Sequence, residues 1–471
     1  MKWDAVVVGS GPNGLTAAIT LATAGRSVVV LEEAPHVGGA CRSQELTLAG
    51  FVHDVGAAVM PWAYDSPAWR ELPLDRYGLE WVAPGAEFAH PLQGDKAVVV
   101  YRDIARTAES LSADGPKYRR LARRLTRNWA SLNEMVLGPP LRYPRHPAGL
   151  AGLGVSGLNS ASHYVERFSD EMAPALFAGC AAHALIPLER RPTAAVGQMF
   201  LGAAHTSGWR FPRGGAGQLT LALAAHFEAL GGEIRLGHRV AKWGDIPDQD
   251  AVVFATGPQA LEQIAGDRIS GRRRRALKRW RYGPGAFKID LALAGPIPWQ
   301  AQELAKAGTV HLGGPWDEVA LALREVAAGR HPRRPFVLLA QPSLFDPSRA
   351  PAGRHTAWAY CHVPTGSTVD MTESILQVIE RFAPGFRDLI LATHSAGPGQ
   401  LHAANRNLVG GDVGGGSYAG RQMFFRPFVS IHPHRMSKRI YLGSASSSPG
   451  GGVHGMGGYW AARSALRHGL R

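Results

Sequence analysis

The sequence predicts a protein of the α/β class whose parallel sheet is completed by segments far apart in the chain. Three observations lead to this prediction. A short β-branched run at residues 5–8 is followed at once by glycines and then by an amphipathic helix. A second glycine-rich turn, at residues 449–456, lies between another apolar run and another helix. The 471 residues are too many for one ordinary core, so a second domain is expected.

The first glycine turn has the pattern of a dinucleotide-binding loop. Gly9 allows the tight turn, Gly11 lets the backbone approach a pyrophosphate, and Gly14 lets the helix pack against the strand. The helix carries an apolar stripe and ends at Gly25. Its free N–H groups and its dipole favour a phosphate at the N-terminus. The turn therefore predicts a dinucleotide held by Gly9, Ser10, Gly11, Pro12, Asn13 and Gly14.

An acidic residue follows the second predicted strand, at residues 27–31. Glu32 stands where a carboxylate accepts hydrogen bonds from the hydroxyls of a ribose. The same charge repels a 2′-phosphate, so Glu32 argues against NADP at this site.

The next segment departs from the pattern of a nicotinamide dehydrogenase, which normally continues into another strand and helix. A glycine doublet, Gly38 and Gly39, comes first, and Arg42 follows. The doublet allows close backbone approach, and Arg42 can neutralise a pyrophosphate; the alternative for Arg42 is an ordinary surface arginine. Cys41 is interpreted as a small buried hydrophobe.

The second glycine turn lies more than four hundred residues further on. A strand at 439–443 precedes it, residues 444–448 form a loop, and a helix is expected to begin at Gly452 and Val453. Two turns of this kind predict one long cofactor that is held from both ends.

Several segments together resemble the phytoene desaturase-like FAD-dependent oxidoreductases, a family that includes carotenoid desaturases, carotenoid isomerases and retinol saturase. The likeness lies in residues 8–32, 38–56, 211–219, 282–293, 357–364, 410–416 and 441–459. Residues 282–288 and 449–456 are closer to the uncharacterised branch. The resemblance implies non-covalently bound FAD in a discontinuous, glutathione reductase-like Rossmann domain, and a substrate domain of helices and a mixed or antiparallel sheet. Many relatives carry a Thr-His pair before the last turn, where this chain has Ser447 and Ser448.

The resemblance also implies which further residues contact FAD. The backbone at Val240 would meet the adenine. The amides near Val453 would face the N1–C2=O2 edge of the flavin, where a helix N-terminus favours the negative charge of the reduced ring. The remaining predicted contacts are Gly56, Ala57, Ala255, Gly257, Gly443, Ser444, Gly451, Gly452 and Met456.

The chain is expected to alternate between two domains. Residues 1–92, 206–284 and 397–471 are assigned to the FAD-binding domain. Residues 93–205 are interpreted as a helical part of the substrate domain, and residues 285–396 as its sheet.

The expected chemistry is hydride transfer between a substrate carbon and flavin N5. The leading interpretation is a dehydrogenase or desaturase that acts on a polyene, lipid or polyketide-like substrate. A saturase, a redox-neutral double-bond isomerase and a non-catalytic FAD-stabilised scaffold stay open as alternatives. Lys288 and His454 are the candidates for acid–base chemistry, although a structural ion pair also explains Lys288.

The composition limits the kinds of molecule that the protein is expected to bind. The formal net charge is +14, and basic residues are densest in a run at residues 272–275. The sequence contains no recognised nucleic-acid-binding module, so nucleic acid is not expected to bind. The run is interpreted as a solvated helix face, or as a surface for anionic lipid headgroups. The three cysteines are too far apart for a disulfide framework or a metal site. The sequence shows no recognisable signal segment and no long apolar stretch. It therefore predicts a cytoplasmic protein, either free or membrane-associated, and it leaves the oligomeric state open.

Overall fold

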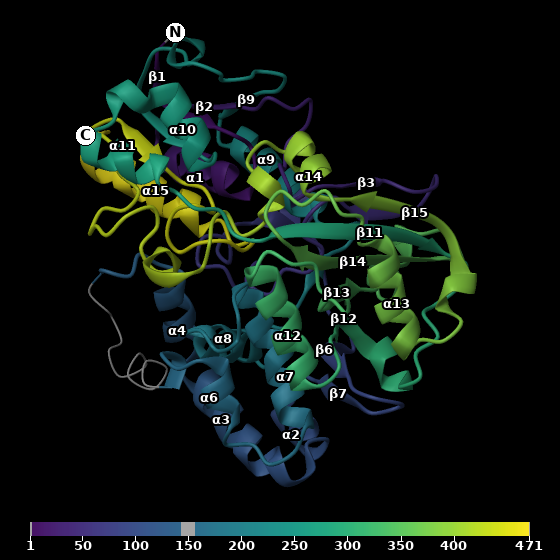
Figure 1. Cartoon of the computed structure of the whole chain (residues 1–471). Helices are drawn as coiled ribbons and strands as arrows, with labels where there is room; N and C mark the ends of the chain where they lie inside the picture. Colours follow the sequence, from purple (N-terminus) through teal and green to yellow (C-terminus); the bar gives the residue numbers. More distant parts are fainter. Residues whose placement is uncertain (1, 143–155, 471) are drawn as a thin grey trace.

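The computed structural model describes residues 2–142 and 156–470 and contains two large sheets in two lobes (Figure 1). The lobe at the upper left of the view contains both ends of the chain and the five-stranded sheet. The lobe at the right contains the seven-stranded sheet, and a group of helices lies below it.

The five-stranded sheet is parallel throughout, with the strand order β16-β10-β1-β2-β9. Helices cover both of its faces, which is why its central strands are almost entirely apolar. On one face, Ala5 and Val7 pack against α1, α9 and α15; on the other, Val6 and Val8 pack against α10 and α11. The strands are β1 (Trp3–Val8), β2 (Val28–Leu31), β9 (Glu233–Arg235), β10 (Gln249–Phe254) and β16 (Ile440–Leu442), and the helices are α1 (Pro12–Thr23), α9 (Gly217–Ala229), α10 (Pro258–Ala265), α11 (Gly271–Lys278) and α15 (Met456–His468).

The two ends of the chain meet in this sheet. Strand β10 pairs with β1 on one side and with β16 on the other. Helix α15 packs closely across α1, because a Cβ on Gly458 would lie only 1.7 Å from the carbonyl oxygen of Asn13. The predicted discontinuous Rossmann-like domain is therefore confirmed, and both glycine turns lie at its edge.

The seven-stranded sheet has the order β15-β11-β14-β13-β12-β6-β7. It is mixed, since only the pair β12 and β6 is parallel. Its strands alternate: Phe287 and Ile289 of β11 pack into an apolar core under helix α13, whereas Lys288 points to the opposite face. The strands are β6 (Ala86–Pro91), β7 (Ala97–Val100), β11 (Gly285–Leu293), β12 (Ala307–Leu312), β13 (Val337–Ala340), β14 (His355–Val363) and β15 (Ile390–Ala396).

Helices from the middle of the chain pack beneath one end of this sheet. Leu121 and Leu125 of α3, Phe177 of α7 and Leu323 of α12 share one core with Phe88 of the sheet. The helices outside the first lobe are α2 (Ile104–Glu109), α3 (Gly115–Arg127), α4 (Trp129–Val136), α6 (Ala161–Val165), α7 (Met172–Ala181), α8 (Thr193–Ala204), α12 (Trp316–Ala327), α13 (Thr372–Phe382) and α14 (Pro398–Ala404).

Short elements connect these layers. Two further pairs of strands are formed by β3 (Ser43–Glu45) with β4 (Val52–Asp54) and by β5 (Trp81–Val82) with β8 (Phe211–Pro212). The 3₁₀ turns are η1 (Leu74–Tyr77), η2 (Ser112–Asp114), η3 (Ala182–Ala184), η4 (Trp243–Asp245), η5 (Gly266–Arg268), η6 (Gln302–Lys306), η7 (Pro342–Leu344), η8 (Pro347–Arg349), η9 (Phe386–Leu389), η10 (Val409–Gly411) and η11 (Gly420–Met423).

Two details differ from the sequence-based expectations. The last helix begins at Met456 rather than at Gly452, because Gly452 and Gly455 have φ values of 130° and 67°, which a right-handed helix excludes. Strand β6 lies before residue 92 but pairs with β12 in the second sheet, so a boundary at 92 cuts through that sheet.

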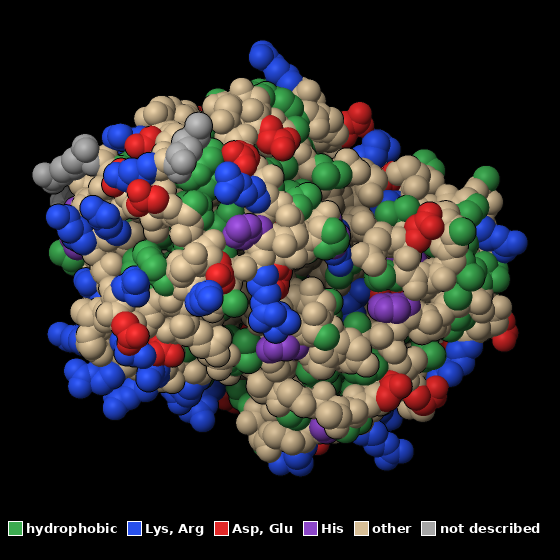
Figure 2. Space-filling model, turned by 90° about the horizontal axis from the view of Figure 1, so that it is seen from above, with side chains coloured by type: hydrophobic (Ala, Val, Ile, Leu, Met, Phe, Trp, Pro, Cys, Tyr) green, Lys and Arg blue, Asp and Glu red, His purple; other side chains and the backbone are tan. Residues whose placement is uncertain are grey.

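The basic run lies on α11 and is partly neutralised by neighbouring acids. Arg274 pairs with Glu262 and Asp267 at 2.7 and 2.8 Å, and Lys278 lies 3.5 Å from Glu262. Figure 2 shows Lys and Arg side chains on all sides of one face, most densely at its left edge, with Asp and Glu side chains among them. This arrangement fits a solvated surface better than one continuous basic patch.

Candidate functional site

A cavity of about 1380 Å³ lies between the two lobes. It exceeds the roughly 300–1,000 Å³ of an ordinary small-molecule pocket. Its walls come from both glycine turns, from one face of the seven-stranded sheet, and from α8 with the turn before it. A space of this size and extent suits a dinucleotide together with a substrate.

The first glycine turn opens α1 toward the cavity. Gly9 has a φ of 99°, and Gly14 has no room for a side chain because its Cβ would lie 1.9 Å from the carbonyl oxygen of Gly9. A Cβ on Gly11 would instead meet nothing within 4 Å, and Gly11 lines the cavity. No side chain caps the N-terminus of α1. Its first N–H groups are therefore left for a ligand.

Glu32 lines the cavity beside this turn and is nearly buried. Its carboxylate accepts hydrogen bonds from the backbone N–H and the hydroxyl of Ser10, at 2.8 and 2.7 Å, and from the N–H of Ala34 at 2.9 Å. Glu32 thus fixes the turn, and its remaining acceptor capacity faces the cavity.

The segment after Glu32 forms a second layer over the turn. The N–H of Gly38 donates to the carbonyl oxygen of Ser10 at 3.1 Å. Arg42 lines the cavity and contacts the ring of His36, while its buried Nε has no hydrogen-bond partner among the described residues. Burial lowers the pKa of Arg42, against the opposing effect of Glu32. Cys41 is buried as expected, and burial raises the pKa of its thiol.

The second glycine turn is held by a buried arginine. Arg426 donates to the carbonyl oxygens of Gly414 and Ala445, both at 3.2 Å. Tyr418, whose ring lies 4.2 Å from the Arg426 guanidinium, accepts a hydrogen bond from the N–H of Gly451 at 3.0 Å. These contacts shape the loop before α15 on the cavity side.

His454 belongs to the same loop and acts as a local cap. Its Nδ1 accepts a hydrogen bond from the N–H of Met456 at 3.1 Å, so Nε2 carries the ring proton. Burial lowers the pKa of His454 to about 4, so the imidazole is neutral at pH 7.

The residues around the cavity fit FAD. An uncapped helix N-terminus with open space at Gly11 suits a pyrophosphate, and the unpartnered Nε of Arg42 is a nearby donor for it. The Glu32 carboxylate suits a ribose. At the opposite end, the loop at 450–454 offers backbone beside the sheet face.

Most of the predicted contacts line the cavity. These are Gly9, Gly11, Pro12, Asn13, Gly14, Glu32, Gly39, Arg42, Gly56, Ala57, Val240, Ala255, Gly257, Ser444, Gly451, Gly452 and Val453, together with the candidates Lys288 and His454. Ser10, Gly38, Gly443 and Met456 do not line it. Ser10 and Met456 are buried, and Gly443 has no room for a side chain because its Cβ would lie 2.9 Å from that of Ala461.

Sequence reasoning missed the aromatic end of the cavity. Trp62, Phe200 and Trp209 line it together with His183 and Tyr360. The rings of Phe200 and Trp209 are 5.5 Å apart, and Phe200 stacks on His183 at 4.2 Å. These residues come from separate helices and loops, so no local motif indicates them.

Lys288 faces the cavity from β11, which lies next to the edge strand β15. Its Nζ lies 2.5 Å from a carboxylate oxygen of Asp290, and both side chains are almost fully buried. Nδ1 of His394 is 3.2 Å from the same oxygen, and Nδ1 of His53 is 3.9 Å from the other. Burial lowers the pKa of His53 to about 4. The lysine is thus anchored in a buried polar cluster.

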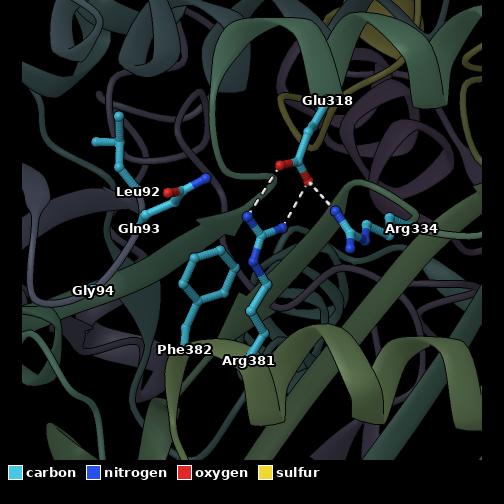
Figure 3. Close-up of a pocket in the computed structure, with 7 residues that line it drawn as sticks. All are labelled: Leu92, Gln93, Gly94, Glu318, Arg334, Arg381 and Phe382. Atoms are coloured by element: carbon cyan, nitrogen blue, oxygen red, sulfur yellow. Dashed lines mark hydrogen bonds and ion pairs between the residues drawn. The ribbon is translucent and has the colours of Figure 1, made fainter.

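A smaller hollow of about 270 Å³ lies between residues 92–94, α12 and α13 (Figure 3). The guanidinium of Arg381 makes two contacts with the carboxylate of Glu318, at 2.6 and 3.0 Å, and Arg334 lies 3.8 Å from it. Because the carboxylate of Glu318 already lies within ion-pair distance of both arginines, we do not assign the hollow a ligand.

Within residues 2–142 and 156–470, no group of three or more His, Cys, Asp or Glu side chains could hold a metal ion. Among the same residues, no helix is both long enough and apolar enough to cross a membrane.

Comparisons with known proteins agree with this site. Residues 7–73 match the family model of the NAD(P)-binding Rossmann-like domain. The chain is 29% identical to phytoene dehydrogenase of Streptomyces griseus over 411 residues, which cover 82% of this chain and 77% of the relative. It is 23% identical to pyridine nucleotide-disulfide oxidoreductase domain-containing protein 2 of Rattus norvegicus, over 99% of this chain and 94% of the relative. In fold, it is similar to an oxidoreductase from Methanosarcina mazei, with a TM-score of 0.65, 18% identity, and coverage of 99% of this chain and 100% of that one. The chain is therefore an FAD-dependent oxidoreductase that is homologous to phytoene dehydrogenase.

Proposed function

We propose that the protein transfers a hydride between a carbon of an apolar substrate and FAD, and that its net reaction is a dehydrogenation or desaturation. One observation carries this proposal: a single cavity extends from the first glycine turn to the aromatic end formed by Trp62, Phe200 and Trp209. The name of the Streptomyces griseus relative, phytoene dehydrogenase, supports a lipophilic substrate.

When bound, FAD supplies an acceptor for two electrons at N5. The chain supplies positions and a dry environment. The turn at 9–14 with Glu32 and Arg42 would hold the adenosine and pyrophosphate half. The loop at 450–454 would hold the flavin half against the sheet. The apolar rings of Trp62, Phe200 and Trp209 would exclude water from the reacting carbon.

The proton that leaves the neighbouring carbon needs an acceptor. His454 donates rather than accepts at its free ring atom, because Nδ1 already accepts from Met456. Lys288 points into the cavity and its Nζ lies 2.5 Å from a carboxylate oxygen of Asp290, so we propose that these two residues accept the proton together: Nζ passes one of its protons to the carboxylate and takes the proton that leaves the carbon.

A peripheral membrane contact stays a proposal. The exposed side chains of Arg272 and Arg275 on α11 would meet anionic headgroups, while Arg274 is already paired with acids of its own lobe.

Anaerobic stopped-flow tests the reaction itself. We expect candidate polyenes and polyketide-like compounds to bleach the flavin band near about 450 nm if they are oxidised. A redox-neutral isomerase would turn substrate over only with pre-reduced flavin. A scaffold would bind FAD that neither substrates nor dithionite reduces, and that result would contradict the proposal.

Glu32→Gln tests the assignment of the ribose contact. We expect FAD to bind about 10–100-fold more weakly, because a charged acceptor is lost from the turn and from the ligand. Titration of FAD by fluorescence quenching measures the change. Glu71→Gln is the matched control: Glu71 lies outside the cavity lining, and its ion pair with Arg70, at 3.7 Å, is at the surface with the Glu71 side chain 85% exposed, so the affinity for FAD should stay within about threefold. Equal affinities for both variants would contradict the role of Glu32.

A further inference from the structure

The cavity-facing side of the seven-stranded sheet carries an unusual number of polar atoms without partners. His311, Leu338, Tyr360 and Lys288 lie side by side on four neighbouring strands. Two residues further along their strands, Thr309 and Trp358 also face the cavity. The hydroxyl of Thr309 and the Nε1 of Trp358 are buried and have no hydrogen-bond partner among the described residues. A purely hydrocarbon ligand would leave such atoms unpaired, at a cost in affinity.

Three histidines lie close together at the His311 end of this row. Nε2 of His183 is 3.2 Å from Nε2 of His311. Nε2 of His90 donates to the carbonyl oxygen of Gly314 at 2.7 Å. The Nδ1 atoms of His311 and His90 lie 2.5 and 3.0 Å from the position that a Cβ on Gly179 would take. The glycine thus leaves room for the two rings to approach each other.

One hydrogen bond in this group involves His183. The Nδ1 atoms of His90 and His311 are buried and have no hydrogen-bond partner among the described residues. In the His183–His311 pair, one Nε2 donates to the other. The Nδ1 of a neutral His183 is then either an acceptor or a donor, according to which ring donates. Among the described residues, none hydrogen-bonds to that atom, and the His183 ring lines the cavity.

The surroundings favour a neutral partner for His183. Burial lowers the pKa of His183 to about 3 and that of His90 to about 4, and it lowers the pKa of His311 as well, so the three histidines are uncharged at pH 7. Lys288 is the charged side chain of this sheet that lines the cavity, at the other end of the row, and its ammonium would repel a cationic ligand that extends along the row. A hydroxyl can donate to Nδ1 or accept from it, and it brings no charge into the cavity.

We propose that His183 binds a hydroxyl group at one end of the substrate, so that the substrate is an elongated apolar molecule with an alcohol or phenol at the end remote from Lys288. This inference rests on the proposed function and specifies its substrate class. Three strand spacings of about 4.8 Å each separate His311 from Lys288 along the row. The apolar rings of Phe200 and Trp209 flank the same end and bind the skeleton next to the hydroxyl.

The test measures binding to the FAD-loaded protein, without turnover. The probes are 4-phenylphenol, which can donate a hydrogen bond, 4-methoxybiphenyl, which cannot, and the ammonium compound biphenyl-4-methanamine. Quenching of tryptophan fluorescence gives each dissociation constant. We expect 4-phenylphenol to bind about tenfold more tightly than 4-methoxybiphenyl, the effect of roughly one buried hydrogen bond.

Variants separate hydrogen bonding from packing. His183→Phe should abolish the preference, and His183→Asn, which can place an amide oxygen near the position of Nδ1, should restore part of it. Phe200→Leu removes an apolar neighbour and should weaken both neutral probes equally. The proposal is overturned if 4-methoxybiphenyl binds as tightly as the phenol, if the preference survives in His183→Phe, or if the ammonium probe binds best. The FAD content and the dithionite reducibility of each variant are measured separately, so a failure of the proposed function is seen there and not in the probe preference.

Discussion

Gly11→Ala is expected to weaken FAD binding by at least about 100-fold while the protein stays folded. In the free protein, the added methyl group meets nothing within 4 Å, so the fold can accommodate it. In the complex, the same methyl group would occupy the space in which a pyrophosphate approaches the backbone at the N-terminus of α1. The loss of several backbone and dipole interactions to a doubly charged group explains the size of the effect.

The control for this variant is Gly244→Ala. Gly244 also has open space around its Cβ position and an ordinary φ, but it lies in η4, outside the cavity lining. FAD titration and circular dichroism should show wild-type behaviour for Gly244→Ala. If Gly11→Ala binds FAD as the wild type does, the pyrophosphate does not lie at this turn.

Lys288→Met is expected to lower the free energy of unfolding by about 3–5 kcal/mol. The substitution leaves the carboxylate of Asp290 buried without its cation, and removing one partner of a buried pair typically costs this much. Replacing both partners, as in Lys288→Met with Asp290→Leu, should recover part of the loss, because no isolated charge then stays in the interior. Urea denaturation followed by circular dichroism measures the difference.

Lys306→Met provides the comparison at the surface. Its ion pair with Glu303 has a similar length, 2.6 Å, but the side chains are 48% and 54% exposed, so the expected loss is at most about 1 kcal/mol. Similar losses for Lys288→Met and Lys306→Met would show that the buried cluster has no special role in stability.

Much of the first lobe follows from local patterns in the sequence. The strand, the three glycines and Glu32 lie within thirty residues. Their positions restrict the type of residue that fits; position 14, for example, has no room for a side chain. The resemblance then extends the assignment to the far end of the chain, where the strand at 440–442 joins the same sheet.

The rest depends on contacts between distant residues. The start of α15 was expected too early, because the glycines at 452 and 455 take left-handed conformations that the sequence alone does not reveal. His183, His311 and His90 are separated by many residues, and they meet only because a helix packs beneath the second sheet. Strands β6 and β7 could not be assigned to that sheet from their sequence, since β6 pairs with β12, more than two hundred residues away, and β7 joins the sheet through β6.

The central claim is that one FAD lies in the cavity, with its pyrophosphate at the first glycine turn and its flavin at the second. Equilibrium dialysis of the purified, folded protein against FAD tests this claim most directly. We predict about one FAD per chain, with an absorption band near about 450 nm, and no displacement by an excess of NADP. A folded protein that takes up no FAD, or that releases it when NADP is added, would contradict the claim.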